Sequence, residues 1–404
     1  MQKRLPQFDF TGHHRINITG SKSESNRLLI LKALYPNIEI SNLSNSQDTQ
    51  VLQKALKSTD EVIDVHHAGT AMRFLTAYFA CFTKKPITLT GSQRMQERPV
   101  KILVEALNDL GCHISYVNHE GYPPLQIHPP SSLKNNVQLS ANISSQYISA
   151  LMLVAPKLKD GLEIELTSNI TSLPYLKMTQ RLMTELGFEV NFDINKISIR
   201  PQQNLNPVQA SVESDWSSAS YFYSLIALSD ELTLDLFTYK KHSLQGDSKL
   251  VGLYKPFGVK TSVFDHFIRL EKSPQTPEGG FFQANLNNTP DIAQTIAVTC
   301  LGLNIPCELT GLETLKIKET DRLVALKTEI EKFGAQVDID DKSLKLTPVK
   351  HLKSGAIIET YNDHRMAMAF APLSTKTDIT INDAEVVEKS YPDFWNDFDK
   401  LANK

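Results

Sequence analysis

Four helix-like runs along the chain each end in an apolar residue followed by glycine, and a β-like stretch comes next. The glycines are Gly111, Gly187, Gly258 and Gly334, and they recur at intervals of 71 to 76 residues. Glycine commonly ends a helix because it accepts a left-handed backbone without steric strain. The regular recurrence therefore predicts tandem supersecondary units. The β-like stretches that follow the glycines are residues 113–117, 189–192, 259–264 and 335–339.

A polar or charged segment precedes each of these predicted helices. Backbone N–H groups are free at a helix start, so such positions favour anions. Reactive side chains at equivalent helix starts predict that the starts converge on one site. The polar segments are residues 94–99, 172–175, 245–247 and 318–322, and a fifth segment, 20–27, precedes the apolar run 28–34.

The segment Lys318-Glu319-Thr320-Asp321-Arg322 is the most informative of the five. Thr320 and Asp321 are typical residues of a helix start, and residues 323–333 have an amphipathic pattern. Lys318 and Arg322 are four positions apart, which places both on one side if the first turn is helical. With Glu319 between two cations, the segment indicates an anionic substrate and a proton transfer. A solvated, charged helix cap is the alternative that this segment alone leaves open.

Composition is that of a globular protein with more than one core. A chain of 404 residues exceeds one typical core, which predicts two domains. Apolar residues make up 41% and charged residues 22%, with a formal net charge of −3. This charge argues against a general nucleic-acid or anionic-membrane surface, so any anion site must concentrate Lys and Arg locally. No apolar stretch approaches the roughly 20 residues that span a bilayer, and no signal peptide is evident, so we expect a cytoplasmic protein.

The cysteines and the familiar short motifs exclude several classes of site. The four cysteines lack metal-ligand spacing, and we expect them to be buried, reduced thiols. The sequence contains no GxGxxG, Walker A or HExxH motif, which removes the simplest nucleotide and zinc-protease interpretations. The cysteines are Cys81, Cys112, Cys300 and Cys307.

Further polar groups stand directly before apolar runs. Asp291 precedes the run 292–301, where an acid is a good helix cap and a candidate base. Residues 144–146 offer two hydroxyls and an amide, and residues 362–365 place an arginine before another apolar run. Each of these groups has a simpler explanation as a helix cap or as close packing. A small-residue turn at 68–73 would also let a ligand approach the backbone closely.

Taken in order, six motifs carry a family resemblance. The chain resembles the 3-phosphoshikimate 1-carboxyvinyltransferases (EPSP synthases), which are enolpyruvyl transferases, from about residue 11 to residue 395. Any one motif is modest support, but six in family order are strong. The motifs are Gly20-Ser21-Lys22-Ser23, Ala68-Gly69-Thr70-Ala71-Met72-Arg73, Arg94-Met95 with Glu97-Arg98-Pro99, Ser144-Ser145-Gln146, residues 318–322, and residues 361–368.

The resemblance implies an α/β fold of two similar globules, each made of three βαβαββ units around a pseudo-threefold axis. We expect residues 1–19 and 243–404 in one globule and 20–242 in the other, with the active site in the cleft between them. The implied reaction transfers the enolpyruvyl group of phosphoenolpyruvate to the 5-hydroxyl of shikimate 3-phosphate and releases phosphate, a step toward chorismate and the aromatic amino acids. The resemblance implies that this reaction needs no metal and no organic cofactor, that the protein is a monomer, and that it is a target of glyphosate.

The resemblance also assigns substrate-binding residues. Arginine suits such anionic substrates because its planar fork donates two parallel hydrogen bonds. Lys22 would reach both substrates. Shikimate 3-phosphate would contact Lys22, Ser23, Arg27, Ser144, Ser145, Ser172, Tyr175, Asp291 and Lys318. Phosphoenolpyruvate would contact Lys22, Gly69, Arg94, Gln146, Arg322, Arg365 and Lys389.

Two acid–base groups are needed, because the 5-hydroxyl loses a proton while the methylene of phosphoenolpyruvate gains one. Asp291 matches the family base and Glu319 the family acid, with Lys22 completing the catalytic set. The cations beside Glu319 favour its ionised form, so bound substrates and desolvation would have to raise its proton affinity. Elimination from the tetrahedral intermediate needs the reverse proton transfer, and one pair of groups can serve both steps.

The sequence departs from the family pattern at several positions, and none of them is an acid, base or arginine of the predicted site. Changes that flank the Gly69 turn lead to the hypothesis of altered glyphosate sensitivity. Three rival functions are a UDP-N-acetylglucosamine enolpyruvyl transferase, which typically carries a loop cysteine missing here, a non-catalytic anion-binding relative, and a metal-dependent phosphotransferase. The departures are His67, Phe74, Leu173, Trp216, Thr314 and Lys316.

Overall fold

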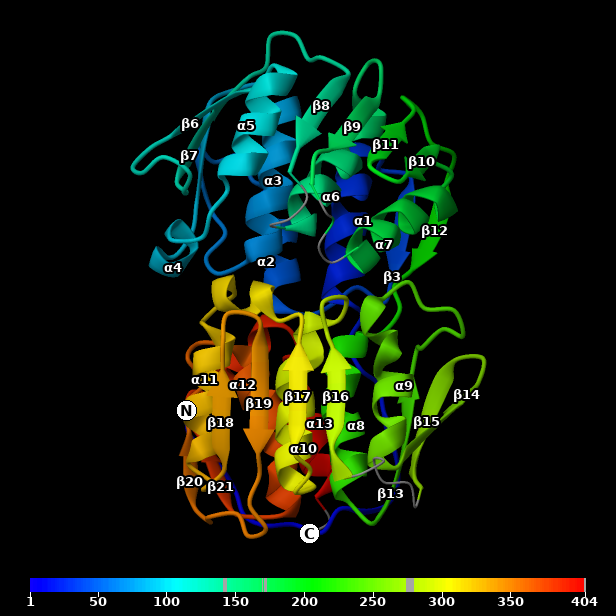
Figure 1. Cartoon of the computed structure of the whole chain (residues 1–404). Coiled ribbons are helices and arrows are strands. Elements are labelled where there is room, and N and C mark those ends of the chain that lie inside the picture. The colour runs from blue at the N-terminus through cyan, green and yellow to red at the C-terminus, as the bar shows by residue number, and fades with distance from the viewer. Residues whose placement is uncertain (141–143, 169, 171–172, 274–279, 403–404) are drawn as a thin grey trace. The chain divides into compact units, whose positions relative to one another are not determined.

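The computed structural model describes the chain except for residues 141–143, 169, 171–172, 274–279 and 403–404. The described chain divides into two compact units (Figure 1). Unit 1 comprises Met1–Thr19 and Glu213–Lys404, and unit 2 comprises Gly20–Val212. None of the described helices combines the length and the apolar character that a membrane crossing requires.

Unit 2 contains two complete βαβαββ repeats and one smaller one. Both complete repeats form four-stranded sheets of the same order, in which the first two strands are parallel and the other pairings antiparallel. The first repeat is β4 (Val62–Asp64), α3 (Gly69–Phe82), β5 (Ile87–Thr90), α4 (Gln93–Gln96), α5 (Lys101–Leu110), β6 (His113–Tyr116) and β7 (Leu125–His128). The second is β8 (Asn136–Leu139), α6 (Ser145–Val154), β9 (Leu162–Leu166), α7 (Leu173–Glu185), β10 (Val190–Asp193) and β11 (Lys196–Ile199). The smaller one pairs β12 (Val208–Ser211) with β3 (Ile38–Ser41) in parallel, beside α1 (Lys22–Leu34) and α2 (Gln47–Lys57).

Unit 1 repeats this plan. Two four-stranded sheets have the same strand order as those of unit 2, and the third sheet has three strands. The first repeat is β2 (Thr11–Ile16), α8 (Trp216–Leu228), β13 (Glu231–Phe237), α9 (Leu250–Leu253), β14 (Val259–Val263) and β15 (Phe267–Lys272). The second is β16 (Phe282–Asn285), α10 (Ala293–Gly302), β17 (Cys307–Thr310), α11 (Arg322–Glu331), β18 (Gln336–Ile339) and β19 (Ser343–Thr347). The third is β20 (Ala356–Ile358), α12 (His364–Phe370), β21 (Ile379–Ile381) and α13 (Phe394–Leu401), with β1 (Lys3–Leu5) beside β21.

The repeat signal in the sequence corresponds to the ends of helical segments in the four complete repeats. Gly111, Gly187, Gly258 and Gly334 have φ values of +107°, +95°, +79° and +93°, which confirms the left-handed turn expected at each. Gly258 follows a 3₁₀ segment, Lys255–Phe257, rather than a full α-helix. In each repeat the strand after the glycine is the edge strand of its sheet.

The structure corrects the second predicted domain boundary. The first boundary, between Thr19 and Gly20, lies where we predicted it. The second lies between Val212 and Glu213 and not between residues 242 and 243, so residues 213–242 belong to unit 1. The reason is the pairing of β13, which forms a parallel ladder with β2 and an antiparallel ladder with β15. Helix α8, which leads into β13, is correspondingly buried in the core of unit 1.

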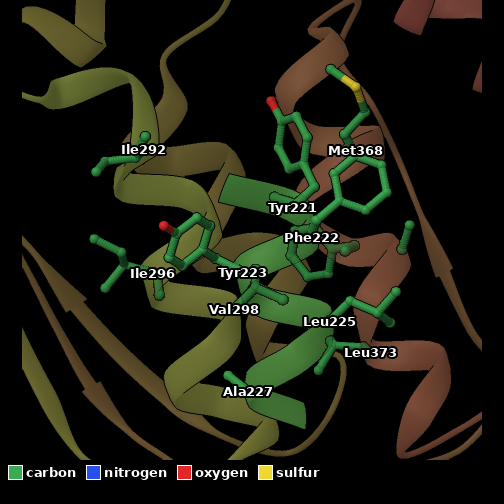
Figure 2. Close-up of a cluster of buried hydrophobic side chains, with 14 of the residues drawn as sticks. Tyr221, Phe222, Tyr223, Leu225, Ala227, Ile292, Ile296, Val298, Met368 and Leu373 are labelled. Carbon is green, nitrogen blue, oxygen red and sulfur yellow. The ribbon is translucent and has the colours of Figure 1, made fainter. Parts of the chain in front are cut away.

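Three helices, one from each repeat, form the centre of each unit. In unit 1 these are α8, α10 and α12, which contact one another, and every residue of α8 is buried. Figure 2 shows Tyr221, Phe222 and Tyr223 of α8 among Ile296 of α10 and Met368 of α12. Helix α8 is apolar or small along its whole length, which suits a helix that packs on all sides. In unit 2 the corresponding helices are α1, α3 and α6, which also contact one another.

Candidate functional site

The candidate residues gather at the starts of the central helices. In unit 1, Asp291 precedes α10 in a short 3₁₀ turn, and Asp363 caps α12. In unit 2, α1 begins at Lys22, α3 at Gly69 and α6 at Ser145. Since each central helix follows a strand at the same place in its repeat, the starts of the helices in one unit lie at the same end of it. Within unit 1, side chains at the starts of α10, α11 and α12 contact one another. The convergence of all five predicted segments on one site stays a prediction.

Asp291 is the centre of the group in unit 1. Its Oδ1 lies 3.1 Å from Nη1 of Arg322 and 3.4 Å from Nζ of Lys318, and its Oδ2 lies 3.2 Å from Nη2 of Arg365. The Asp291 side chain is 17% exposed, so this carboxylate is accessible while three cations surround it. A carboxylate in this position can accept a proton, and the cations beside it can bind anions.

Arg322 joins the predicted acid to the same group. Its Nη2 donates to Oε2 of Glu319 at 2.8 Å, and its Nε donates to Oδ2 of Asp363 at 2.6 Å. The Asp363 side chain is fully buried, and its Oδ1 accepts the backbone N–H of Arg365 at 2.9 Å. Burial alone would lower the pKa of Arg322, but the carboxylates of Asp363, Glu319 and Asp291 raise it. Arg322 is therefore a fixed cation that orients three acids.

The start of α11 partly follows the prediction. Asp321 is the N-cap, and its carboxylate accepts the N–H groups of Leu323 and Val324 at 3.1 and 3.3 Å. Lys318 lies before the helix in extended backbone, so it is not in the first turn. Lys318 and Arg322 nevertheless reach the same oxygen of Asp291. Their convergence comes from the bent segment 318–320 before the helix and not from helical spacing.

Arg365 and Lys389 extend the group along α12. Nη1 of Arg365 lies 3.4 Å from the hydroxyl of Tyr221, on α8. Burial alone would lower the pKa of Arg365, but Asp291 and its other acidic neighbours raise it. Lys389 ends a 3₁₀ segment, Ala384–Lys389, that packs against α12, and its Nζ donates to the carbonyl of Asn362 at 2.6 Å.

Asp247 is a further acid of unit 1 that the sequence analysis did not single out. It lies in the 3₁₀ turn Gly246–Lys249, its side chain is buried, and its Oδ1 has no hydrogen-bond partner in the described part of the chain. Burial, reinforced by the nearby carboxylate of Asp291, raises the pKa of Asp247 to about 8. This carboxyl group therefore holds its proton at neutral pH.

Arg27 is the central cation of unit 2. Its Nε donates to Oγ1 of Thr179 at 2.7 Å, and its Nη1 donates to the carbonyl of Ser23 at 2.8 Å. Its Nη2 lies 3.2 Å from Oγ of Ser149 and 3.4 Å from the carbonyl of Tyr175. All four acceptors are neutral, and the described residues supply no carboxylate in salt-bridge contact with Arg27. Burial lowers the pKa of Arg27 to about 10.

Two aromatic rings complete the surroundings of Arg27. The guanidinium carbon lies 5.5 Å from the ring centroid of Phe74 and 5.9 Å from that of Tyr175. Aromatic faces attract cations, so the rings offset part of the desolvation of this buried charge. Phe74, which departs from the family pattern, is fully buried in α3.

The other candidate residues of unit 2 form smaller contacts. Lys22 pairs with Asp48 of α2 at 3.1 Å. Ser144 caps α6 by accepting the N–H of Gln146 at 3.3 Å, and Nε2 of Gln146 donates to Oγ1 of Thr70 at 3.2 Å. Ser145 is the first residue of α6 and is buried.

Gly69 is closely approached by an arginine that the sequence analysis quoted only within a motif. A Cβ on Gly69 would lie 2.6 Å from Nη1 of Arg98, so any larger residue at this position would displace the guanidinium group. Arg94, by contrast, is exposed and pairs with the equally exposed Glu97 at 3.0 Å. Ser172, which the family resemblance assigned to substrate binding, lies outside the described residues.

Comparisons with known proteins identify the family. The family model for EPSP synthase (3-phosphoshikimate 1-carboxyvinyltransferase) matches residues 52–398. A 3-phosphoshikimate 1-carboxyvinyltransferase of Bacteroides fragilis is 44% identical over 391 residues, which cover 96% of this chain and 95% of that protein. The chain belongs to the EPSP synthase family.

Other relatives agree with this assignment. The enzyme of the same name from Haemophilus influenzae is 35% identical over 426 residues, covering 96% of each chain. The solved structure of EPSP synthase from Acinetobacter baumannii shares the fold with a TM-score of 0.79 at 19% identity, covering 99% of this chain and 98% of that one. The enolpyruvyl transferase NikO from Streptomyces tendae has a TM-score of 0.72 at 13% identity and covers 99% and 97%. The enolpyruvyl transferase fold predicted from the sequence is thus confirmed.

In this EPSP synthase family member, the described contacts join some of the predicted residues to one another and leave others with different partners. In unit 1, ion pairs connect five of the predicted residues: Asp291, Lys318, Glu319, Arg322 and Arg365. Lys389 donates to the carbonyl of Asn362, the residue before Asp363. In unit 2, Ser23, Arg27 and Tyr175 are joined, and Gln146 reaches the residue after Gly69. Lys22 and Arg94 contact acids of their own unit. The residues that sequence reasoning missed are Asp48, Arg98, Asp247 and Asp363.

A signal for one of the missed residues was present in the sequence. An acid directly before a predicted helix, as Asp363 is before residues 364–370, is a helix cap, and a cap that lies in a site can also orient an arginine. Arg98 and Asp247 lie in polar segments that the sequence analysis named, 94–99 and 245–247, but nothing local to them or to Asp48 indicates their contacts with other elements. Among the described residues, no group of three or more His, Cys, Asp or Glu is arranged to hold a metal ion. The four cysteines are buried, unpaired thiols, as predicted.

Proposed function

We propose that the chain transfers the enolpyruvyl group of phosphoenolpyruvate to the 5-hydroxyl of shikimate 3-phosphate and releases phosphate, a step of aromatic amino-acid biosynthesis. Family membership over nearly the whole chain supports this reaction. The structural observation that supports this reaction best is that the two predicted acid–base residues are both paired with one guanidinium group. Asp291 and Glu319 contact different nitrogens of Arg322, at 3.1 and 2.8 Å.

In the addition step, Asp291 takes the proton of the 5-hydroxyl while the hydroxyl oxygen forms a bond to C2 of phosphoenolpyruvate. Glu319 gives its proton to the methylene carbon, which becomes a methyl group, and a tetrahedral intermediate results. In the elimination step the bond from C2 to the phosphate oxygen breaks, and the methyl group returns a proton to Glu319. The double bond reforms, and phosphate leaves with the proton that Asp291 took from the 5-hydroxyl, so both acids return to their starting state. Atoms and charges balance with one acid–base pair.

The donor is held by the cations of unit 1. Phosphoenolpyruvate carries a carboxylate and a phosphate, and the bidentate geometry of Arg322 and Arg365 suits either group. Both guanidinium groups are now occupied by protein carboxylates. An anionic substrate that competes for Arg322 loosens its hold on Glu319. This competition raises the proton affinity of Glu319, which is what an acid catalyst needs.

The acceptor is held by residues of unit 2, with Asp291 and Lys318 of unit 1 completing the set. Arg27 and Ser23 lie together, and the helix start at Ser144 and Ser145 offers hydroxyl groups and free backbone N–H groups. Lys22 would contact both substrates. The proposal therefore assigns both groups of residues to one reaction.

Two finer proposals rest on the family resemblance. The chain acts as a monomer, and it acts in the cytoplasm, where four unpaired thiols are compatible with a reducing environment. Light scattering on the purified protein should give the mass of one chain. A dimer at micromolar concentration would contradict the first proposal.

Phosphate release by the purified protein tests the reaction. Release should require both phosphoenolpyruvate and shikimate 3-phosphate, and mass spectrometry should find the enolpyruvyl ether of the acceptor. UDP-N-acetylglucosamine serves as the competing acceptor, and turnover with it alone would support the rival transferase. A folded protein that binds shikimate 3-phosphate without turnover would be a non-catalytic relative, and the proposal would fail.

A further inference from the structure

Glu329 is a fully buried acid that the proposed chemistry does not use. It lies on α11, seven residues after Arg322, and its side chain is 0% exposed. Its Oε1 accepts the hydroxyl of Tyr361 at 2.7 Å, and its Oε2 accepts the backbone N–H of Glu359 at 3.0 Å. Nζ of Lys332 donates to the same Oε2 at 2.6 Å. A buried carboxylate with three donors is fixed in place and fixes its partners in turn.

The partners of Glu329 lie in a strained turn. Tyr361 and Asn362 follow each other with φ values of +53° and +56°, in the left-handed region that side chains other than glycine rarely adopt. Two such residues in succession persist only where their surroundings hold them. The Tyr361 side chain is 37% exposed, so packing holds it only in part. Glu329 accepts hydrogen bonds from Tyr361 in the turn and from Glu359 just before it.

This turn leads directly into the candidate site. The carbonyl of Asn362 accepts Nζ of Lys389 at 2.6 Å. The next residue, Asp363, binds Nε of Arg322 at 2.6 Å and caps α12 at the N–H of Arg365. Helix α11 therefore contacts segment 359–363 twice, through Arg322 at its start and through Glu329 two turns later.

We propose that Glu329 is a positioning residue for Lys389 and Arg365, acting through the turn 359–363. It holds the left-handed turn in the one conformation that presents the Asn362 carbonyl to Lys389 and Asp363 to the start of α12. The identity of the ligand, phosphoenolpyruvate, rests on the proposed function. Glu329 touches no substrate and donates no proton in the reaction.

Steady-state kinetics of three variants test the proposal. Glu329→Gln keeps the size of the side chain but removes the charged acceptor, and Tyr361→Phe removes one hydroxyl. Both should raise the KM for phosphoenolpyruvate, Glu329→Gln by roughly tenfold, the usual effect of losing a hydrogen bond to a charged group. The KM for shikimate 3-phosphate should stay within about threefold of the parent value. Glu331→Gln is the matched control, since Glu331 lies two residues away and pairs with Lys327 on the surface of the same helix.

Hydrogen exchange on the same variants supplies a readout that does not depend on turnover. The amide of Glu359 should exchange faster in Glu329→Gln, because its acceptor is weakened, and should be unchanged in Glu331→Gln. Lower thermal stability with both KM values and the exchange rate unchanged would overturn the proposal. If Glu329→Gln fails to fold, an unchanged KM for phosphoenolpyruvate in Tyr361→Phe overturns it equally. If the parent protein shows no turnover, the proposed function fails. Faster exchange of the Glu359 amide in Glu329→Gln would then still support the role of Glu329 in holding the turn.

Discussion

Arg27 in unit 2 and Arg322 in unit 1 are both buried cations, but their surroundings are opposite. Arg27 donates to neutral oxygens and lies between two aromatic rings, and its pKa is lowered by burial to about 10. Arg322 contacts three carboxylates, which raise its pKa against the effect of burial. The hydrogen-bond acceptors of Arg27 are neutral, and Glu24 offsets the effect of burial on its pKa only in part. Arg322 is paired with three carboxylates.

The difference indicates two ways to receive an anion. At Arg27 an incoming anion meets a guanidinium that donates to neutral oxygens, so binding adds an ion pair without displacing a carboxylate from salt-bridge contact. At Arg322 an incoming anion competes with acids already present, so binding changes the state of those acids. The first arrangement favours affinity, and the second couples binding to proton transfer. In the proposed reaction, binding of the acceptor suits unit 2, and a donor that must be protonated suits unit 1.

The largest predicted effect is on stability at Arg322. Arg322→Met leaves the fully buried carboxylate of Asp363 without its cation, which should lower the free energy of unfolding by about 3–5 kcal/mol. Urea unfolding of the purified variant measures this change. Lys327→Met, on the same helix but in a half-exposed pair with Glu331, should cost less than about 1 kcal/mol. Equal losses in the two variants would show that the compensation at Arg322 contributes nothing.

The next effect is on turnover. Asp291→Asn and Glu319→Gln should each lower kcat by at least ~100-fold, the usual scale for a lost acid–base group. Rapid phosphate-release assays at saturating substrates measure it. Asp321→Asn is the control, because asparagine caps helices as well as aspartate does and the loss of charge is the same. Near-normal turnover of either acid variant removes that residue from its proposed role.

The most gradual effect is a pH dependence of stability at Asp247. The folded protein holds the proton of this carboxyl up to about pH 8, whereas the unfolded chain loses it near the ordinary aspartate pKa of 3.8. Between these values rising pH therefore destabilises the folded state, by at most about 1.4 kcal/mol per pH unit from this group. Asp247→Asn should remove that slope, so its advantage over the parent should be absent near pH 4 and largest near pH 8.

Unfolding free energies from pH 4 to pH 8 measure the difference between the Asp247→Asn variant and the parent. Asp338→Asn, at an exposed position of the same unit, should follow the parent throughout. A parallel pair of pH curves for Asp247→Asn and the parent would mean that Asp247 is ionised in the folded protein.

The repeat architecture was predictable from the sequence because its signal is local. A glycine that ends a helix needs a left-handed backbone whatever the rest of the fold does, and all four have it. The cap at Asp321 was predictable for the same reason. The boundary near residue 213 was not, because β13 pairs with β2, about 220 residues earlier in the chain, and nothing in either strand identifies that partner.

The site residues divide in the same way. Asp291, Glu319 and Arg322 stand out by their places at helix starts and by family resemblance. The burial of Asp363 against Arg322 joins residues 41 positions apart, and the proton held by Asp247 depends on burial that no short motif encodes. The departure Phe74 acquires a role only in three dimensions, as one of the two rings that face Arg27.

The measurement that tests the central comparison most directly is made on Arg27→Met. Its former acceptors keep partners, since Oγ of Ser149 and Oγ1 of Thr179 bond each other at 3.0 Å and Thr179 also donates to the carbonyl of Tyr175. Calorimetry should therefore find at least tenfold weaker binding of shikimate 3-phosphate, while the free energy of unfolding changes by no more than about 2 kcal/mol. Unchanged affinity together with a loss of stability as large as that of Arg322→Met would show that Arg27 is a structural cation, and would contradict the account.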